Sequence, residues 1–279
     1  MRALLLAAGL GTRLRPLTDY LPKCLVPIHG RPLLDYWLET LAAGGIEEIL
    51  INTHYLAPLV VEFLSESTWA RHVKFVHEDR LLGTGGTILK NRGFFENEAF
   101  IVAHADNLTL FDVSDFVKCH ASRPADTELT MMVFETPDPR SCGIVEPDEK
   151  GVVQAFHEKV SSPPGNLANA AVYILEPSIV DFMAALGKEE IDFSTEVIPA
   201  MMGRISTFPN SSYHRDIGTI ASWSQANRDF PVIPPAPQNK RAWNELLKPG
   251  GGDLPSIIER LLASAVPVPP HDGASADSQ

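Results

Sequence analysis

Residues 3–18, ALLLAAGLGTRLRPLT, decide the fold of this chain. The first five of them form a continuous apolar run, which is typical of a strand covered on both faces. A loop rich in glycine and arginine follows directly. Ligands of open α/β sheets bind beyond the carboxyl ends of the strands, so this loop is the first candidate for a binding site.

Strands and helices alternate after this loop. We expect strands over residues 48–52, 73–77 and 99–103, and helices over 33–43, 56–65, 87–91 and 113–120. The helix over 33–43 is bracketed by Pro32 and by Gly44, and its leucines recur at helical spacing. Alternation with short connections predicts an α/β fold, in which a mostly parallel, Rossmann-like sheet is flanked by helices.

The pattern changes after residue 126. Closely spaced strands are expected over 127–135, 143–146, 152–156 and 170–175, which indicates an antiparallel extension of the sheet. Helices over 178–186 and 195–202 follow, and a last exchange through 205–208, 213–217 and 221–229 completes the compact part.

The composition shifts at residue 231. The last 49 residues contain nine prolines, against fourteen in the preceding 230. Prolines at that density exclude regular packing. We therefore expect a proline-rich tail over 231–279, with one amphipathic helix over 253–263 and a disordered end over 271–279.

Charge and cysteine content exclude several classes of protein. The chain has 23 Lys and Arg against 35 Asp and Glu, a net charge of −12, which argues against nucleic acid or an anionic membrane as the main partner. Its three cysteines form no C-x-x-C pair, so neither a disulfide framework nor a cysteine zinc site is indicated. No apolar run reaches the roughly 18 residues that a spanning helix needs. We expect a cytoplasmic protein.

The glycine-rich loop has the chemistry of a phosphate site. Gly9 and Gly11 allow backbone amides to approach an anion, and Arg13 can place a forked guanidinium on phosphate oxygens. Two familiar phosphate loops do not fit. A dinucleotide fingerprint needs a glycine where Leu14 stands, and the Gly-Lys-Ser/Thr of a Walker loop is absent from the sequence.

The complete pattern resembles the sugar-1-phosphate nucleotidyltransferases, also called nucleotide-sugar pyrophosphorylases. Their signature, L-A-A/G-G-x-G-T-R-L-x-P-L-T followed by P-K, is matched by residues 6–18 and by Pro22-Lys23. Five further segments resemble family motifs: LGTGG at 82–86, AHAD at 103–106, FHEK at 156–159, NAAVY at 169–173 and DIGT at 216–219. The resemblance implies a nucleotidyltransferase domain over 1–230, with a nucleotide-binding half over 1–125 and a sugar-binding half over 126–230.

The implied enzyme reaction is attack by a sugar 1-phosphate oxygen on the α-phosphorus of a nucleoside triphosphate, with release of pyrophosphate. Two polyanions must meet in line, so cations and positioned donors lower the barrier. The resemblance assigns catalysis to Arg13, Lys23, Asp106 and Asp216. Asp106 and Asp216 would hold Mg²⁺, with Mn²⁺ or Co²⁺ as alternatives. The remaining nucleotide-binding residues would be Leu6, Ala8, Gly9, Gly11, Thr12, Glu78, Gly83, Thr84 and Gly85, and the sugar phosphate would bind Gly143, Glu158, Lys159, Asn169 and Asp192.

The base and the sugar stay open. The LGTGG segment is similar to that of mannose- and heptose-1-phosphate guanylyltransferases, so we expect GTP. Some uridylyltransferases for amino sugars carry a similar Thr-Gly-Gly, and a uridylyltransferase for a hexose or amino sugar is the alternative. A non-catalytic regulatory subunit that binds nucleotide sugars is an alternative of another class. Such a subunit would be expected to have lost some of the four catalytic residues, and all four are present. The resemblance does not decide whether the chain forms a homo-oligomer.

Several residues have two interpretations at this stage. Glu78 pairs with a base or ribose group, or is a solvated strand-end charge. Asp192 contacts the sugar, or caps a helix. Arg15 binds phosphate, or is a solvated loop charge. His104 and His214, each two residues before an aspartate, line the metal region or pack between sheet and helices. Cys24, beside Lys23, is a reactive thiol or a small packing residue.

Overall fold

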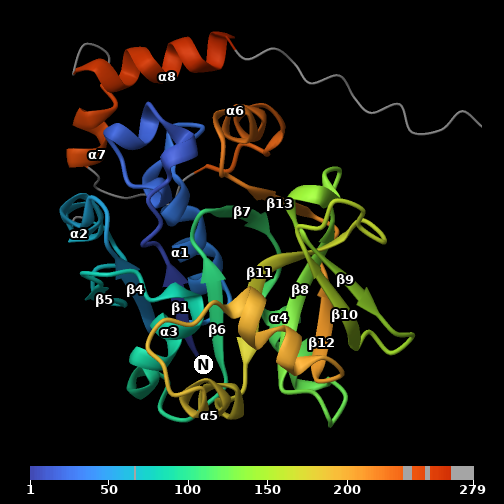
Figure 1. Ribbon diagram of the computed structural model, residues 1–279. Helices are drawn as coiled ribbons and strands as arrows, with labels where there is room; N and C mark the ends of the chain where they lie inside the picture. Colours follow the sequence, from blue (N-terminus) through green and yellow to red (C-terminus); the bar gives the residue numbers. More distant parts are fainter. Residues whose placement is uncertain (66, 235–240, 249–251, 265–279) are drawn as a thin grey trace, which may run out of the picture.

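The chain forms a nine-stranded sheet with helices on both faces, as Figure 1 shows. This computed structural model describes residues 1–65, 67–234, 241–248 and 252–264. Four strands form a parallel core in the order β6, β1, β4, β5, and their bounds are Phe100–His104, Arg2–Leu6, Ile49–Thr53 and Val73–His77. The parallel core predicted from the first half of the sequence is confirmed.

The antiparallel extension is attached through the long strand β11 (Leu167–Leu175), which runs antiparallel to β6. It pairs on its other side with β8 (Leu129–Glu135), and beyond the end of β6 its Ala168 pairs with β9 (Gly143–Pro147) on the same side as β6. Strand β9 pairs in turn with β10 (Val153–Glu158). The last strand, β12 (Ile205–Pro209), joins β8 in parallel. The predicted extension is therefore present, and a parallel strand closes its edge.

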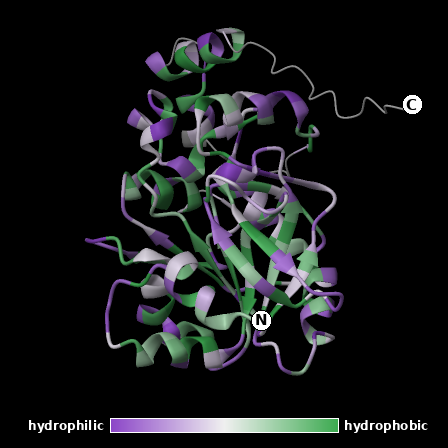
Figure 2. Ribbon diagram, turned by 45° about the vertical axis from the view of Figure 1, so that its right-hand side comes forward, coloured by the Kyte–Doolittle hydropathy of each residue, from purple (hydrophilic) through white to green (hydrophobic). Residues whose placement is uncertain are grey.

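The two faces of the sheet carry separate hydrophobic cores because side chains alternate along each strand. In β1, Ala3 and Leu5 belong to one core and Leu4 to the other. The first core is covered by α1 (Leu33–Ala43), α2 (Ala57–Ser65), α4 (Val113–Ala121) and α6 (Ile220–Asp229), and the second by α3 (Gly83–Lys90) and α5 (Pro177–Ala185). Figure 2 shows the apolar strands enclosed between these layers.

Two small strand pairs place the loops at the carboxyl edge of the sheet. A hairpin of β2 (Pro27–Ile28) and β3 (Arg31–Pro32) leads into α1. Strand β7 (Asn107–Leu110), which directly follows the loop after β6, pairs antiparallel with β13 (Tyr213–Asp216). Neither β7 nor the hairpin was predicted, because runs this short have no clear period of their own.

Other departures from the predicted elements have local causes. The predicted helix over 195–202 is a π-helical turn at Phe193–Val197 followed by a 3₁₀ turn at Pro199–Met201. Proline has no backbone donor, so Pro199 cannot continue the first turn. Helix α3 begins at Gly83, four residues before the predicted start. Among the described residues no helix is both long and apolar enough to span a bilayer.

The tail forms more structure than its proline content predicts. Helix α7 (Arg241–Leu246) was not predicted, whereas α8 (Asp253–Ser264) agrees with the expected helix over 253–263. Leu254 and Ile257 of α8 belong to the first hydrophobic core, and α8 lies across the end of the molecule near α6 in Figure 1. The predicted disorder over 271–279 falls outside the described residues.

Packing of α8 predicts that Leu254→Ala destabilises the whole domain. Leu254 is 3% exposed, and truncating a buried leucine costs about 2–5 kcal/mol. Leu262→Ala on the same helix is the matched control, because Leu262 is 36% exposed and its truncation should cost less than about 0.5 kcal/mol. Urea unfolding measures both. Equal, small effects would show that α8 is not part of the cooperative fold.

Candidate active site

The turn after β1 holds the signature residues in a backbone shape that requires glycine at position 11. Gly11 has φ +63°, and a Cβ there would lie 2.8 Å from Cγ2 of Thr18. The hydroxyl of Thr18 donates to the carbonyl of Gly11 at 2.8 Å and fixes the turn. At Gly9, by contrast, an added Cβ would meet no atom within 4 Å. The space above Gly9 is therefore open to a ligand.

Lys23 lies at the centre of the site, between two carboxylates that are far apart in the sequence. Its Nζ is 2.6 Å from Oδ2 of Asp106 and 3.4 Å from Oδ1 of Asp216. Lys23 is only 8% exposed, whereas the side chains of Asp106 and Asp216 are 28% and 57% exposed. The ammonium thus lies inward of two carboxylates that open towards solvent.

The β7–β13 pair explains why the two aspartates meet. Asp216 is opposite Asn107 in this pair, and the amide of Ile217 donates to the carbonyl of Asp106 at 3.1 Å. Each aspartate lies at a strand end, as the sequence predicted. The following Gly218 packs closely on Asp216, and a Cβ there would lie 3.2 Å from Nη2 of Arg13.

The guanidinium of Arg13 is therefore beside the Asp216 turn. Arg13 is exposed and forms no ion pair with any residue that the structure describes, so it is available to an incoming anion. Arg15 differs, because its Nε lies 3.2 Å from exposed Asp19. The exposure of Arg15 fits a solvated loop charge, and a contact of Arg15 with phosphate stays a prediction.

Burial and charge act in opposite directions on this cluster. Burial disfavours the ammonium of Lys23, but Asp106 and Asp216 outweigh that effect and raise its pKa. Burial likewise disfavours the carboxylate of Asp106, but Lys23 and the other neighbours hold its pKa below the usual value. Both groups are therefore charged near neutral pH.

The glycines of the LGTGG segment have a structural role that the sequence analysis missed. They form the first turn of α3, and residues 189–192 cross directly over it. The amides of Gly85 and Gly86 donate to the carbonyl of Ile191, at 3.0 and 3.4 Å, and the amide of Ile191 donates to the carbonyl of Leu82 at 3.0 Å. A Cβ at Gly86 would lie 2.2 Å from the carbonyl oxygen of Glu189. Side chains are excluded here by the protein backbone itself.

Glu78 is a buried charge that ties the site together. It is 1% exposed, so its interpretation as a solvated charge is wrong. Its Oε1 accepts from Thr87 at 2.6 Å and from Nδ2 of Asn52 at 3.1 Å. Asn52 in turn accepts from the amide of Ala7 at 2.7 Å. This network joins the N-terminal turn to α3, and a contact of Glu78 with a base or ribose stays a prediction.

The predicted sugar-side residues form two neighbouring groups. Gly143 lies opposite Glu158 in the β9–β10 pair, and Lys159 Nζ is 3.1 Å from Oε1 of Glu158. Asn169, at an irregularity in β11, donates to the hydroxyl of Tyr173 at 2.7 Å.

Acidic groups act on two buried side chains, Tyr173 and His104. Burial raises the pKa of Tyr173, and the charges of Glu158 and Asp192 raise it further. Burial lowers the pKa of His104, and the charges of Asp106, Asp216 and Asp192 oppose that shift. Asp192 accepts from the amide of Thr195 at 2.9 Å, so its role as a helix cap is confirmed. A sugar contact of Asp192 stays a prediction.

The remaining nucleotide-side residues line the same edge. Leu6 ends β1 and its carbonyl accepts from the amide of Ala105 at 3.0 Å, Ala8 is buried, and Thr12 is exposed. The hydroxyl of Thr84 lies 3.2 Å from Nε2 of His104. His104 therefore links the first turn of α3 to β6.

The contacts of His104 and His214 favour the interpretation that both histidines pack in the fold over a role at the metal region. His214 packs on Phe134 with ring centroids 4.2 Å apart, and burial lowers its pKa to about 3. Neither His104 nor His214 forms a hydrogen bond with Asp106 or Asp216 among the described contacts.

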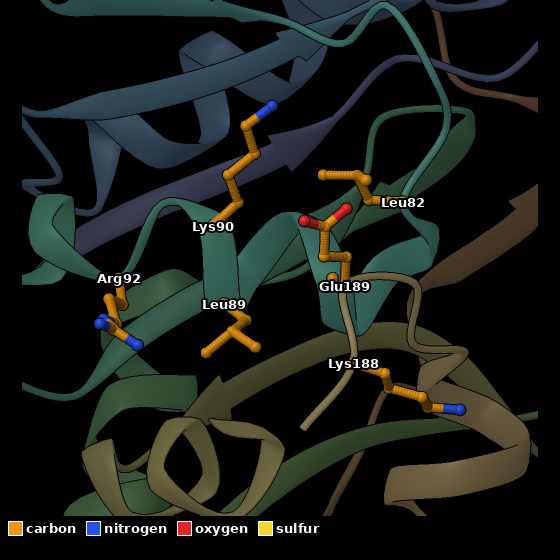
Figure 3. Close-up of a pocket in the computed structure, with 7 residues that line it drawn as sticks. Leu82, Leu89, Lys90, Arg92, Lys188 and Glu189 are labelled. Atoms are coloured by element: carbon orange, nitrogen blue, oxygen red, sulfur yellow. The ribbon is translucent and has the colours of Figure 1, made fainter. Parts of the chain in front are cut away.

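A hollow of about 410 Å³ lies outside this site, where α3 meets residues 188–189 (Figure 3). Leu82, Gly86 and Leu89 line it together with Lys90, Arg92, Lys188 and Glu189. Figure 3 shows the charged ends of Lys90, Arg92 and Lys188 pointing away from one another. They do not form a joint anion site.

Sequence reasoning missed three contributors to the site. Asn52 ends an apolar strand at the same edge as the other site residues, and that position was a usable signal. Ile191 acts through a tertiary contact with Leu82, for which the local sequence holds no signal. Tyr173 contacts Asn169 four residues away in the same strand, within the NAAVY segment, so its signal was local.

Comparisons with known proteins agree with this geometry. Residues 2–231 match the nucleotidyl transferase family, and the chain belongs to it. It is 34% identical over 233 residues to a mannose-1-phosphate guanylyltransferase of Mycobacterium tuberculosis, with 82% of this chain and 64% of the relative covered. It is 32% identical over 235 residues to a glucose-1-phosphate thymidylyltransferase of Streptomyces griseus, with 82% and 65% covered.

The crystal structure of HddC from Yersinia pseudotuberculosis, complexed with GMP-PN, is similar to this one. Its TM-score is 0.70 at 27% identity, covering 82% of this chain and 99% of that one. The chain spans less than two thirds of the length of the two curated relatives above.

Close packing of residues 189–192 on α3 predicts that Gly86→Ala destabilises the protein. The new methyl group would overlap the Glu189 carbonyl, and relieving such an overlap costs about 1–3 kcal/mol. Gly93→Ala is the control, because a Cβ there meets nothing within 4 Å. Thermal unfolding compares the two variants. A Gly86→Ala protein as stable as Gly93→Ala would contradict the observed packing.

Burial of Cys24 predicts that its thiol resists alkylation in the native protein. Cys24 is 1% exposed, and burial raises its pKa to about 12, so the reactive-thiol interpretation is not supported and packing is favoured. Mass spectrometry after iodoacetamide treatment at pH 8 should find half-buried Cys142 labelled and Cys24 unlabelled, with or without nucleotide. Rapid labelling of Cys24 that nucleotide prevents would restore the alternative.

Proposed function

We propose that this chain is a sugar-1-phosphate nucleotidyltransferase, which joins a nucleoside triphosphate to a sugar 1-phosphate and releases pyrophosphate. One observation carries the proposal: a buried ammonium, Lys23, lies between Asp106 and Asp216 directly beneath a turn whose Gly9 is open and whose Arg13 is unpaired in the described structure. Cations and open backbone converge here at the carboxyl edge of a parallel sheet.

Each of the three cationic side chains would stabilise a different phosphate group in the reaction. Arg13 would neutralise the β- and γ-phosphates, where charge accumulates as pyrophosphate leaves. Lys23 would lie near the α-phosphate, where its compact ammonium can serve both reacting anions. Lys159 would hold the sugar phosphate, and Glu158 would accept hydrogen bonds from sugar hydroxyls. Because the reacting groups are both anionic, most of the catalysis would come from this positioning.

A divalent cation fits the two aspartates. Their carboxylates already enclose a positive charge, and oxygen ligands of this kind suit Mg²⁺, with Mn²⁺ as the substitute. When bound, the cation would reduce the repulsion between the two phosphate groups. The described part of the chain contains no group of three or more potential metal ligands, so substrate oxygens and water would complete the coordination.

We propose GTP as the nucleotide and a mannose- or heptose-like 1-phosphate as the sugar. The guanylyltransferase relative and the structure with GMP-PN support guanine. The thymidylyltransferase relative is almost as similar, so base choice needs a direct test.

Turnover of a substrate matrix tests the proposed reaction. Five nucleoside triphosphates are combined with several sugar 1-phosphates, and pyrophosphate release is measured. We expect GTP to give the highest rate, and Asp216→Asn to lower it at least about 10²-fold while the circular dichroism spectrum is kept. The proposal would be overturned if no substrate pair released pyrophosphate, or if Asp216→Asn and the wild type released it at equal rates.

The open space at Gly9 predicts a selective loss in Gly9→Ala. The methyl group meets no protein atom, so the free energy of unfolding should be unchanged within about 0.5 kcal/mol. If the triphosphate lies on this backbone, the affinity of the variant for the triphosphate should fall at least about tenfold, because the methyl group occupies the space of the phosphates. Calorimetric titration with a non-hydrolysable GTP analogue measures the change. Unaltered affinity would exclude the phosphates from this turn.

A further inference from the structure

The ammonium of Lys23 lies between the two carboxylates that the proposed function assigns to a metal. It is nearly buried, its Nζ contacts one oxygen of each proposed metal ligand, and it holds the two carboxylates together. We infer that Lys23 occupies the divalent-cation position in the substrate-free chain, so that metal and Lys23 compete for Asp106 and Asp216. The inference rests on the proposed function for the identity of the metal ligands.

The local charges explain why both cations are not held at once. Lys23, Asp106 and Asp216 together carry one net negative charge. A divalent ion added to them would leave a net positive charge, next to the guanidinium of Arg13. Like charges within a few ångströms repel strongly in a partly buried site. With only two carboxylates present, the free chain should bind divalent metal weakly.

A triphosphate would remove this conflict. Its negative charges can accept both the ammonium and the metal, so Lys23 can leave the carboxylates for the phosphates. The stem of Lys23 is fixed beneath the turn, since a Cβ at Gly11 would lie 3.1 Å from Cβ of Lys23. Its four-carbon chain leaves the ammonium free to swing from that anchor. Metal binding and nucleotide binding are therefore coupled, and Lys23 is the positioning residue that couples them.

Mn²⁺ binding without nucleotide tests the competition directly. Free Mn²⁺ is measured by electron paramagnetic resonance during titration of the full chain. We expect Lys23→Met to bind Mn²⁺ at least about tenfold more tightly than the wild type, because the competing charge is gone. Lys23→Arg, which keeps the charge, should stay weak. Arg15→Met removes a positive charge outside the cluster and should match the wild type.

Two further variants keep the test decisive. Lys23→Gln retains a donor for the carboxylates and replaces Lys23→Met if that variant does not fold. Adding Asp216→Asn to the tighter-binding variant should abolish the gain, which locates the ion. Equal or weaker Mn²⁺ binding after loss of the Lys23 charge would overturn the inference.

The result is independent of turnover, because no substrate is present. Tighter Mn²⁺ binding with no pyrophosphate release from any substrate pair would leave the competition standing and overturn the proposed reaction alone.

Discussion

The contact of one ammonium with two carboxylates organises this molecule. Lys23, Asp106 and Asp216 come from the 3₁₀ turn Lys23–Leu25, the loop after β6 and the end of β13, and no local contact would bring them together. A buried lysine without these partners would be costly, and the two aspartates would repel each other. The three segments are therefore held in one arrangement, which also places Arg13 beside the same cluster.

A second constraint connects the nucleotide side of the site to the sugar side. Residues 189–192 donate to and accept from the first turn of α3, and Asp192 at their end caps the next helical turn. A shift of α3 would therefore move Asp192. The buried pair of Asn52 and Glu78 connects α3 to the N-terminal turn in the same way. In the proposed function, recognition of base, phosphates and sugar would depend on segments that these hydrogen bonds join.

Sequence reasoning found the elements that local patterns determine. The helix over 33–43 and the strand over 73–77 were predicted with their observed bounds, because apolar residues define both and Pro32 and Gly44 bracket the helix. The positions of Asp106 and Asp216 at strand ends followed from the same patterns. Gly83, Gly85 and Gly86 admit the backbone of residues 189–191, a role that the sequence analysis did not assign to them. That approach is tertiary, and no short stretch of sequence encodes it.

In the proposed function the turn after β1 binds a triphosphate, and Lys23 moves to meet it. A crystal structure with a non-hydrolysable GTP analogue and Mg²⁺ tests this most directly. We expect the phosphates over Gly9 and Gly11, the ion between Asp106 and Asp216, and the Lys23 ammonium on phosphate oxygens. A nucleotide bound elsewhere, or Lys23 still between the two carboxylates, would contradict the account.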